Sequence, residues 1–177
     1  PSLSAQPGYG ALPSAVEPVL KNAISAILPE RGSPLFKAAH FHFQSYGKLL
    51  RGRTALDLSR VVGLEWSKAI HWAVAVELMH NASLVHDDIC DDDQFRRDRT
   101  SVMANFGTPL AVCFGDWLVA RSFESALLAV GSGAGIPAIS LLASVMRKLS
   151  EGEAAEFLGT PALDWKSYEK IVMQKTV

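Results

Sequence analysis

The segment that decides the fold runs from Ser67 to Asp91 and reads SKAIHWAVAVELMHNASLVHDDICD. Apolar residues recur along it at helical spacing and cover most of the circumference of the predicted helix, so we expect this helix inside a bundle rather than on its rim. The helix also carries a polar stripe, because five side chains fall within a sector of roughly 120° at about 100° per residue. These side chains are Glu77, His80, Ser83, Asp87 and Asp91. Unpaired charge in a core is very costly, so the stripe predicts an internal cavity in front of it.

The rest of the chain shows the same helical spacing, and neither Asn-Gly nor Asp-Gly, the usual hairpin turns, is present. The sequence therefore predicts an all-α bundle. Ser14 and Glu17 form a capping-box pattern that opens a helix to about Leu28, and Ser33-Pro34 is typical of a cap followed by a first-turn proline. Further helices are expected over residues 54–62, 108–130, 136–157 and 164–177.

Length and composition indicate one folded domain. The chain has 177 residues, of which 49% are hydrophobic and 20% charged, so enough apolar surface is available to offset the entropy of ordering the chain. We assign residues 13–177 to this domain and expect residues 1–12, which are rich in Pro, Gly and Ser, to be a flexible leader. The formal net charge of −1 and the lack of a long basic run argue against nucleic-acid binding.

Two other features bear on location. Residues 123–146 carry little charge, but the glycine-rich residues 131–135 and Pro137 interrupt them, so two buried helices are expected rather than a membrane span. Cys90 and Cys113 are the only cysteines, too few for a disulfide framework, and both are expected to be reduced thiols in a cytoplasmic protein.

Five carboxylates lie within the seven residues from Asp87 to Asp93. Asp87 and Asp91 are one helical turn apart on one face, and Asp88 and Asp92 form a second such pair. Like charges at this spacing repel unless a cation lies between them, and Mg²⁺ takes one or two carboxylates together with water and phosphate oxygens. The segment therefore indicates a magnesium site. The alternative is a solvated acidic helix end.

Three arginines follow the acidic run directly: Arg96, Arg97 and Arg99. Arginine is the side chain best shaped to fork onto phosphate oxygens. Carboxylates that hold a metal beside arginines that hold phosphate describe a site for Mg²⁺ and a diphosphate. The alternative is that the two clusters neutralise each other. His80 alone would be interpreted as a core histidine, and only its place on the polar stripe favours a role in this site.

Residues 77–91, ELMHNASLVHDDICD, followed by Arg96-Arg97, resemble the first aspartate-rich motif, DDxxD, of the head-to-tail trans-isoprenyl diphosphate synthases. Further motifs of that family occur in its own order. They are GKLLRG at residues 47–52, similar to GKxxR; Phe106-Gly107 and AVCFGDWL at residues 111–118, which resemble FG…AVLAGDxLL; and Lys175-Thr176, which resembles the KT pair. The likeness extends over residues 34–177 and implies the isoprenoid synthase fold, a helical bundle around a central cavity.

The resemblance implies an Mg²⁺-dependent prenyltransferase that condenses an allylic diphosphate with isopentenyl diphosphate to give a polyprenyl diphosphate. By this resemblance Asp87 and Asp91 would ligate Mg²⁺, with Asp88 supporting them. Arg96 and Lys175 would bind the allylic diphosphate. The diphosphate of isopentenyl diphosphate would be held by Lys48, Arg51, His80 and Arg97, and Thr176 would complete the substrate-binding residues. The family also implies a homodimer or a heteromer.

The chain departs from the family pattern at several places. Asp98-Arg99-Thr100-Ser101 stands where the family has Gly-x-Pro-Thr, Met103 stands where many members carry His, and Leu49 replaces an arginine of one branch. The family's second aspartate-rich motif, beyond the KT pair, is missing before the chain stops at Val177. We therefore expect the N-terminal part of a synthase, with a bundle incomplete at its C-terminus and little or no turnover alone. A natural subunit completed by a partner is the second choice.

Product length depends, in this family, on the side chains about one turn before DDxxD. Bulky aromatic residues there close the elongation tunnel, whereas this chain has Ala82 and Ser83. The resemblance therefore predicts a medium or long polyprenyl product, with Met79, Val76 or Trp72 as a deeper floor.

Three other functions stay open. A class I terpene cyclase would share the aspartate-rich motif but would not need Lys48, Arg51 and Arg97 for a second diphosphate, so consumption of isopentenyl diphosphate separates the two. A non-catalytic or half subunit of a heteromeric prenyl synthase would release diphosphate with Mg²⁺ only after mixing with its partner. A metal phosphohydrolase is indicated only by His86-Asp87, without other evident histidine ligands.

Overall fold

The computed structural model describes residues 16–130 and 136–157 and, beyond them, residues 165, 169 and 173. Its elements are α1 (Val16–Ser25), α2 (Phe36–His42), α3 (Leu50–Val61), α4 (Trp66–Cys90), β1 (Phe95–Arg96), β2 (Arg99–Thr100), α5 (Val102–Phe106), α6 (Thr108–Val130) and α7 (Ile136–Phe157). The predicted all-α bundle is confirmed, apart from one short two-stranded ribbon that the sequence analysis missed. Among the described helices, none is both long and apolar enough to cross a membrane.

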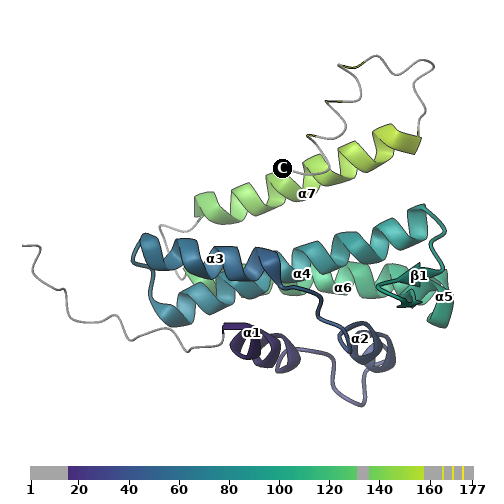
Figure 1. The fold of residues 1–177 in the computed structure, drawn as a ribbon, viewed down its shortest axis with the longest axis horizontal. Coiled ribbons are helices and arrows are strands. Elements are labelled where there is room, and N and C mark those ends of the chain that lie inside the picture. Colours follow the sequence, from purple (N-terminus) through teal and green to yellow (C-terminus); the bar gives the residue numbers. More distant parts are fainter. Residues whose placement is uncertain (1–15, 131–135, 158–164, 166–168, 170–172, 174–177) are drawn as a thin grey trace, which may run out of the picture.

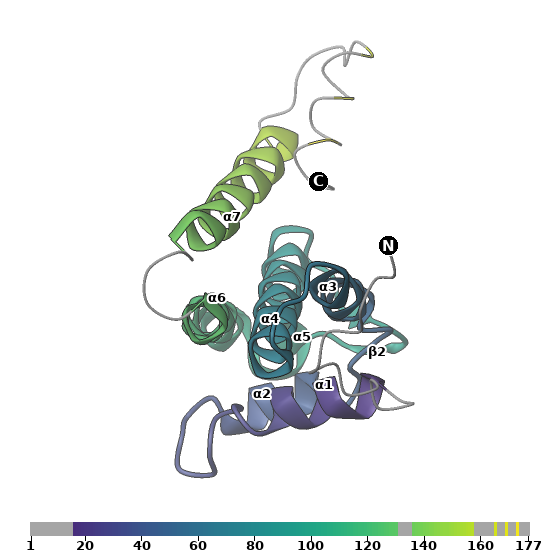
Figure 2. The same ribbon diagram turned by 90° about the vertical axis from the view of Figure 1, so that its left-hand side faces the viewer.

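Helix α4 lies at the centre of the bundle. Figure 2 shows α6 on one side of it and α3 on the other, with α1 and α2 over one face of this layer and α7 over the opposite face. The main core gathers around α4 from all of these directions except that of α7. Its fully buried members include Leu20, Ile24, Leu56, Leu78, Phe114 and Leu118. Helix α4 therefore lies inside the bundle, as its apolar periodicity predicts.

Small residues let α4 and α6 approach closely. A Cβ added at Gly115 would clash with Nε2 of His86. About two turns further along α6, the Ser122 hydroxyl donates a hydrogen bond of 2.7 Å to the carbonyl oxygen of Ala75 on α4. Both contacts fix the rotation of α4 about its axis relative to α6. They therefore also decide which α4 side chains face α3 and α7.

The predicted helix limits hold for α4, α6 and α7 to within one residue. Helix α3 starts at Leu50 rather than near residue 54, because Leu49 turns the chain into the helix with a left-handed backbone. Helix α2 starts at Phe36 and its N-cap residue is Leu35, which makes no side-chain hydrogen bond, so the predicted Ser33 cap is wrong. The Ser33 hydroxyl instead accepts from the Leu35 N–H, inside the turn that precedes the helix. The expected leader and the Ser14 cap lie outside the described residues. Of the helix expected over 164–177, the described residues 165, 169 and 173 are helical.

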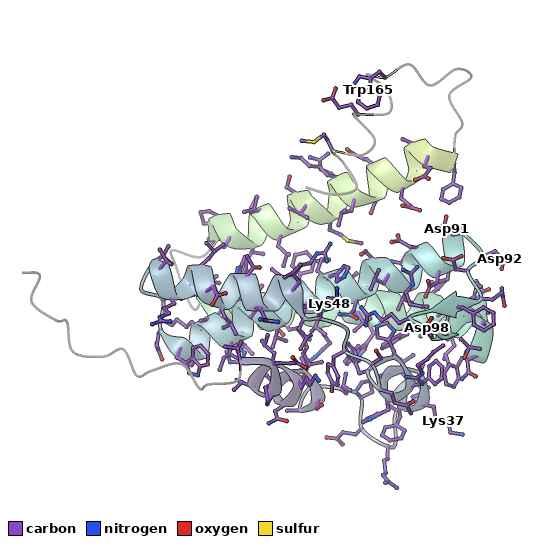
Figure 3. The ribbon with its side chains drawn as sticks, in the orientation of Figure 1. Lys37, Lys48, Asp91, Asp92, Asp98 and Trp165 are labelled. Carbon is purple, nitrogen blue, oxygen red and sulfur yellow. The ribbon has the colours of Figure 1, made fainter. Side chains whose placement is uncertain are left out.

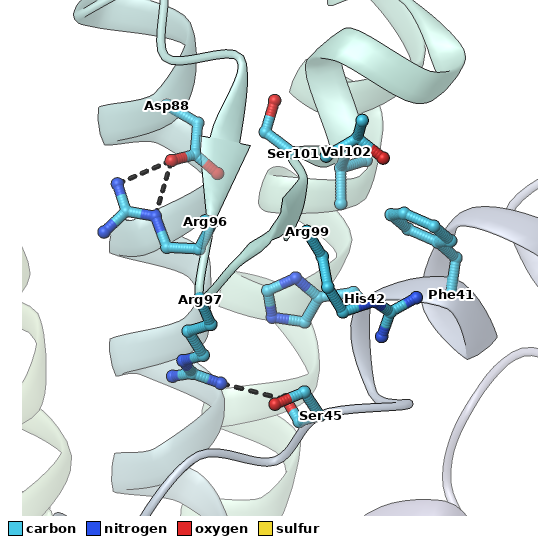
Figure 4. A pocket seen from close by; sticks show the side chains of 10 residues that line it. Phe41, His42, Ser45, Asp88, Arg96, Arg97, Arg99, Ser101 and Val102 are labelled. Carbon is cyan, nitrogen blue, oxygen red and sulfur yellow. Dashed lines mark hydrogen bonds and ion pairs between the residues drawn. The ribbon is translucent and has the colours of Figure 1, made fainter.

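The missed ribbon is a tight hairpin between α4 and α5. Phe95 pairs with Thr100 and Arg96 with Arg99, so the turn consists of Arg97 and Asp98. Both turn residues have left-handed backbones, with φ of 54° and 61°. This is the geometry that hairpins usually give to Asn-Gly or Asp-Gly. Arg97-Asp98 gives no such local signal, and contacts with the segment after α2 hold the turn instead (Figure 4).

Candidate functional site

The acidic run forms the C-terminal end of α4. Asp87 is half-buried and Asp91, the residue that caps the helix end, is exposed. The carbonyl end of a helix carries a partial negative charge, which adds to the attraction of the acidic side chains for a cation. No group of three potential ligands is assembled among the residues described. Two carboxylates one turn apart nevertheless fit Mg²⁺, which completes its shell with water and phosphate oxygens.

Asp88 faces a different direction from the predicted metal ligands. It is 2% exposed, and its Oδ1 accepts from Nε and Nη2 of Arg96 at 2.6 and 2.5 Å (Figure 4). Arg96 also approaches Asp93, whose Oδ2 lies 3.6 Å from Nη2 of Arg96. Burial raises the pKa of Asp88, while the hydrogen bond and charge of Arg96 oppose that rise. Asp88 therefore fixes the position of Arg96 beside the acidic end.

Arg97 joins the hairpin to the segment that carries Lys48. Its Nη1 donates a hydrogen bond of 2.9 Å to the carbonyl oxygen of Ser45 (Figure 4). Its guanidinium lies against Gly47, where an added Cβ would be 2.7 Å from Cζ. Gly47 has a φ of 64°, so glycine serves both the turn and the close approach there. Two of the basic residues predicted from separate motifs, Arg97 and Lys48, are thereby brought to one segment.

His80 and Arg51 both line a groove beside α4. Burial, together with the positive charges of Arg51 and Arg97, lowers the pKa of His80 to about 4. The imidazole is therefore neutral near pH 7. It can donate or accept a hydrogen bond at the site but does not add a positive charge.

The acidic pair and the basic region, which consists of Lys48, Arg51 and Arg97 around His80, lie at different levels along α4 rather than at one point. His80 precedes Asp87 by seven residues, which is about 10 Å along a helix. Figure 3 shows Lys48 alongside the middle of the bundle and Asp91 at one end of it. Lys175 and Thr176 lie outside the described residues. The structure thus provides an acidic end and a basic region beside it, along the same helix.

An apolar groove of about 910 Å³ runs between α3, α4, α6 and α7. Ser83 lines it near His80, and Met79, Val76 and Trp72 line it further down α4. Of the predicted polar stripe, His80 and Ser83 line this groove, whereas Glu77, Asp87 and Asp91 are not among its lining residues. Glu77 is 2% exposed and packs beneath α3. Ala82, predicted beside Ser83 as a chain-length residue, is fully buried in the main core instead.

Sequence reasoning missed a buried polar chain behind the hairpin. Nε2 of His42 lies 2.8 Å from Oδ1 of Asn81, and Nδ2 of Asn81 donates at 2.8 Å to the carbonyl oxygen of Glu77. His42 lines a small pocket together with Asp88, Arg96, Arg97 and Arg99. Its partner is 39 residues away. No local pattern could therefore have indicated this pairing.

The buried histidine predicts a pH dependence of stability. Burial lowers the pKa of His42 to about 4, against 6.5 for an ordinary histidine. Between these values the unfolded chain binds a proton that the folded chain does not, so the free energy of unfolding falls as the pH falls. The slope from His42 approaches about 1.4 kcal/mol per pH unit. Urea titrations from pH 7 to 4 are expected to show a shallower loss for His42→Gln, and parallel curves would contradict this assignment.

Proteins of known name resemble this chain in both sequence and structure. The sequence profile of the polyprenyl synthetase family matches residues 33–177. A geranylgeranyl pyrophosphate synthase of Geoglobus acetivorans is 36% identical over 145 residues, which are 80% of this chain and 46% of the relative. The solved structure of the geranylgeranyl pyrophosphate synthetase of that archaeon superposes with a TM-score of 0.82 at 32% identity, over 90% of this chain and 53% of the other.

Two further relatives broaden the comparison. An octaprenyl diphosphate synthase of Haemophilus influenzae is 30% identical over 90% of this chain and 49% of its own length. A polyprenyl synthase from Caulobacter crescentus, solved in complex with calcium and isoprenyl diphosphate, superposes with a TM-score of 0.81 at 26% identity, over 89% and 48% of the two chains. The chain thus spans about half the length of the curated relatives it matches. Because the family profile covers most of the sequence, the chain belongs to the polyprenyl synthetase family.

Proposed function

We propose that the protein containing this chain is a head-to-tail prenyltransferase that joins an allylic diphosphate to isopentenyl diphosphate. One observation carries the proposal: a single helix, α4, bears an acidic pair at its end and His80 two turns earlier, with an apolar groove beside it. The acidic end suits a metal-bound diphosphate, the basic region suits a second diphosphate, and the groove suits a hydrocarbon tail. The relatives named as geranylgeranyl and octaprenyl diphosphate synthases support the same reaction class.

Asp87 and Asp91 would hold Mg²⁺, and the ion, when bound, would neutralise the diphosphate leaving group. The Caulobacter relative, solved with calcium and isoprenyl diphosphate, supports a divalent ion at this kind of site. Arg96, held by Asp88, would bind the allylic diphosphate together with Lys175. Lys48, Arg51 and Arg97 would bind the diphosphate of isopentenyl diphosphate, with neutral His80 as a hydrogen-bonding partner. Thr176 would complete this set.

The residues of this chain contribute orientation and charge rather than a nucleophile. The allylic carbon–oxygen bond breaks and the electron pair leaves with the diphosphate, where Arg96 stabilises the developing negative charge. The alkene of isopentenyl diphosphate then forms the new carbon–carbon bond with the allylic cation. One proton is lost to the departing diphosphate, so no basic side chain is required. The walls of the groove exclude water from the cation.

The direct test measures the incorporation of labelled isopentenyl diphosphate by the full-length natural protein. With Mg²⁺ and allylic diphosphates of five, ten or fifteen carbons, we expect label to enter longer prenyl diphosphates. Consumption of the allylic diphosphate without incorporation of label would identify a terpene cyclase instead. Turnover that begins only after a second, different subunit is added would identify one half of a heteromer, and turnover by the protein alone with the mass of two subunits would support a homodimer. The thiols of Cys90 and Cys113, neither in a disulfide, support a cytoplasmic location.

We propose a medium or long polyprenyl product, because the groove continues past Ser83 to Val76 and Trp72. Ser83→Tyr is expected to shorten the product, since its ring would fill the groove one turn before the acidic pair. Ser67→Tyr, the same substitution at an exposed position of α4, is the control and should leave the product distribution unchanged. Chromatography of dephosphorylated products checks both. A product of only ten or fifteen carbons from the unmodified protein would contradict the proposal, as would an unchanged product from Ser83→Tyr.

A further inference from the structure

Helix α3 begins without a cap of its own. Its N-cap residue, Leu49, has φ 47° and ψ 37°, in the left-handed region, and offers no side-chain hydrogen bond. A left-handed backbone at a non-glycine residue costs about 1–2 kcal/mol, and the N–H groups of a first helical turn need acceptors. The side chain of Leu49 is 2% exposed, so burial holds this residue in place. The start of α3 therefore depends on contacts from elsewhere in the fold.

The missing acceptor comes from the middle of α4. Oε1 of Glu77 accepts a hydrogen bond of 2.7 Å from the backbone N–H of Gly52, the third residue of α3. That N–H is one of those that a capping side chain normally serves. A Cβ on Gly52 would lie 2.7 Å from Cγ of Glu77, so the carboxylate fits only because this residue is glycine. Helix α4 thus caps α3 across 25 residues of sequence.

The location of this acid is otherwise unfavourable. Glu77 is 2% exposed, and burial raises its pKa, while the Gly52 N–H and the charges of Arg51 and Arg97 oppose that rise. A negative side chain here would also repel a diphosphate bound by the basic residues nearby. An oxygen acceptor that reaches the first turn of α3 explains why a side chain of this length and polarity occupies a buried position.

Two proposed diphosphate ligands sit on the structure that Glu77 holds. Lys48 directly precedes the N-cap residue, and Arg51 is the second residue of α3. A change in the first turn of α3 would move both of them relative to His80, which lies one turn after Glu77 on α4. His80 and Arg51 line the same groove, so their spacing depends on how α3 is anchored to α4.

We propose that Glu77 is a positioning residue: its carboxylate, by capping α3 at Gly52, sets Lys48 and Arg51 to receive the diphosphate of isopentenyl diphosphate. The identity of that ligand rests on the proposed function. The capping role rests on the hydrogen bond and the close approach to Gly52.

Two substitutions in the full-length natural protein separate the effect of side-chain length at Glu77 from the effect of its charge. Glu77→Gln keeps an oxygen acceptor at the same distance and removes the charge, whereas Glu77→Asp keeps the charge and is one methylene too short. We expect Glu77→Gln to hold the KM for isopentenyl diphosphate within about twofold, and Glu77→Asp to raise it about tenfold. The KM for the allylic diphosphate should stay unchanged in both. Glu65→Gln, at an exposed carboxylate just before α4, is the control and should change neither KM.

Gly52→Ala provides a second route to the same loss. Its added Cβ would displace the Glu77 side chain, so it should reproduce the selective effect of Glu77→Asp. The proposal is overturned if Glu77→Gln is the damaging variant, because charge would then be the relevant property. It is also overturned if both KM values rise together, or if only thermal stability changes, because the role would then be structural alone.

Binding of inorganic diphosphate without added metal keeps this test separate from the proposed reaction. Calorimetry should show wild-type affinity for Glu77→Gln and about tenfold weaker binding for Glu77→Asp and Gly52→Ala. If this pattern holds in a protein that consumes no isopentenyl diphosphate, the capping role stands and the proposed function fails. If the protein consumes isopentenyl diphosphate and all variants bind and turn over alike, the capping role fails and the proposed function stands.

Discussion

Asp87→Asn combined with Asp91→Asn, in the full-length natural protein, is expected to lower kcat by about 1,000-fold or more while the fold is kept. The two carboxylates are the proposed protein ligands of Mg²⁺. Asparagine is uncharged and cannot replace a carboxylate in binding the cation. Loss of one preorganised charge-stabilising group commonly costs 100- to 1,000-fold, about 3–4 kcal/mol of barrier. Initial rates with labelled isopentenyl diphosphate, measured against Mg²⁺ concentration, check this result.

Asp92→Asn is the matched control for the acidic pair. Asp92 lies in the same acidic run, is exposed and has a φ of 53°, a left-handed backbone that asparagine tolerates well. The substitution removes one negative charge, where the double variant removes two, and does not touch the proposed ligands, so kcat should change by less than about threefold. An equal loss of activity in Asp92→Asn would mean that overall negative charge, rather than the pair one turn apart, is the relevant feature.

Arg96→Met is expected to produce the largest loss of stability among the site substitutions. Asp88 is 2% exposed and Arg96 is its ion-pair partner, so the substitution leaves a buried carboxylate without a guanidinium. Removing one partner of such a pair costs about 3 kcal/mol. Burial already raises the pKa of Asp88. Without Arg96 the pKa of Asp88 in the folded chain should rise further. The loss of unfolding free energy should therefore grow as the pH rises above the pKa of an ordinary aspartate.

Urea unfolding of Arg96→Met and of two companions checks this prediction. Arg147→Met breaks an exposed ion pair with Glu151 and should cost less than about 0.5 kcal/mol. Asp88→Asn combined with Arg96→Met should recover part of the loss, because no charge is then left buried. Equal destabilisation by Arg96→Met and Arg147→Met would show that the pair with Asp88 is not a buried interaction in solution.

The fold could be predicted where the local pattern alone decides the structure. The apolar periodicity of α4 predicts a helix over residues 67–91, and the structure has Trp66–Cys90. The hairpin could not be found in this way, because Arg97 and Asp98 are held in their left-handed backbones by tertiary contacts such as Arg97 with Ser45. The start of α3 escaped prediction for the same reason, since its cap is Glu77.

The candidate site shows the same division. The spacing of Asp87 and Asp91 along a helix is a local property and could be inferred from sequence. The direction of a side chain on a crowded helix is not. Glu77 was expected to face the cavity with the rest of the polar stripe, but the close approach of Gly52 draws it beneath α3 instead. Ala82 was expected in the tunnel wall, but it packs in the main core while its neighbour Ser83 lines the groove.

The long uninterrupted α4 also restricts how this sequence can change over evolution. The capping acid, the histidine of the basic region and the acidic pair all project from one helix of 25 residues and its C-cap, with no intervening loop. Inserting or deleting one residue between His80 and Asp87 would rotate the acidic pair by about 100° about the helix axis and shift it by about 1.5 Å. Homologues should therefore tolerate substitutions along this helix far better than changes in its length.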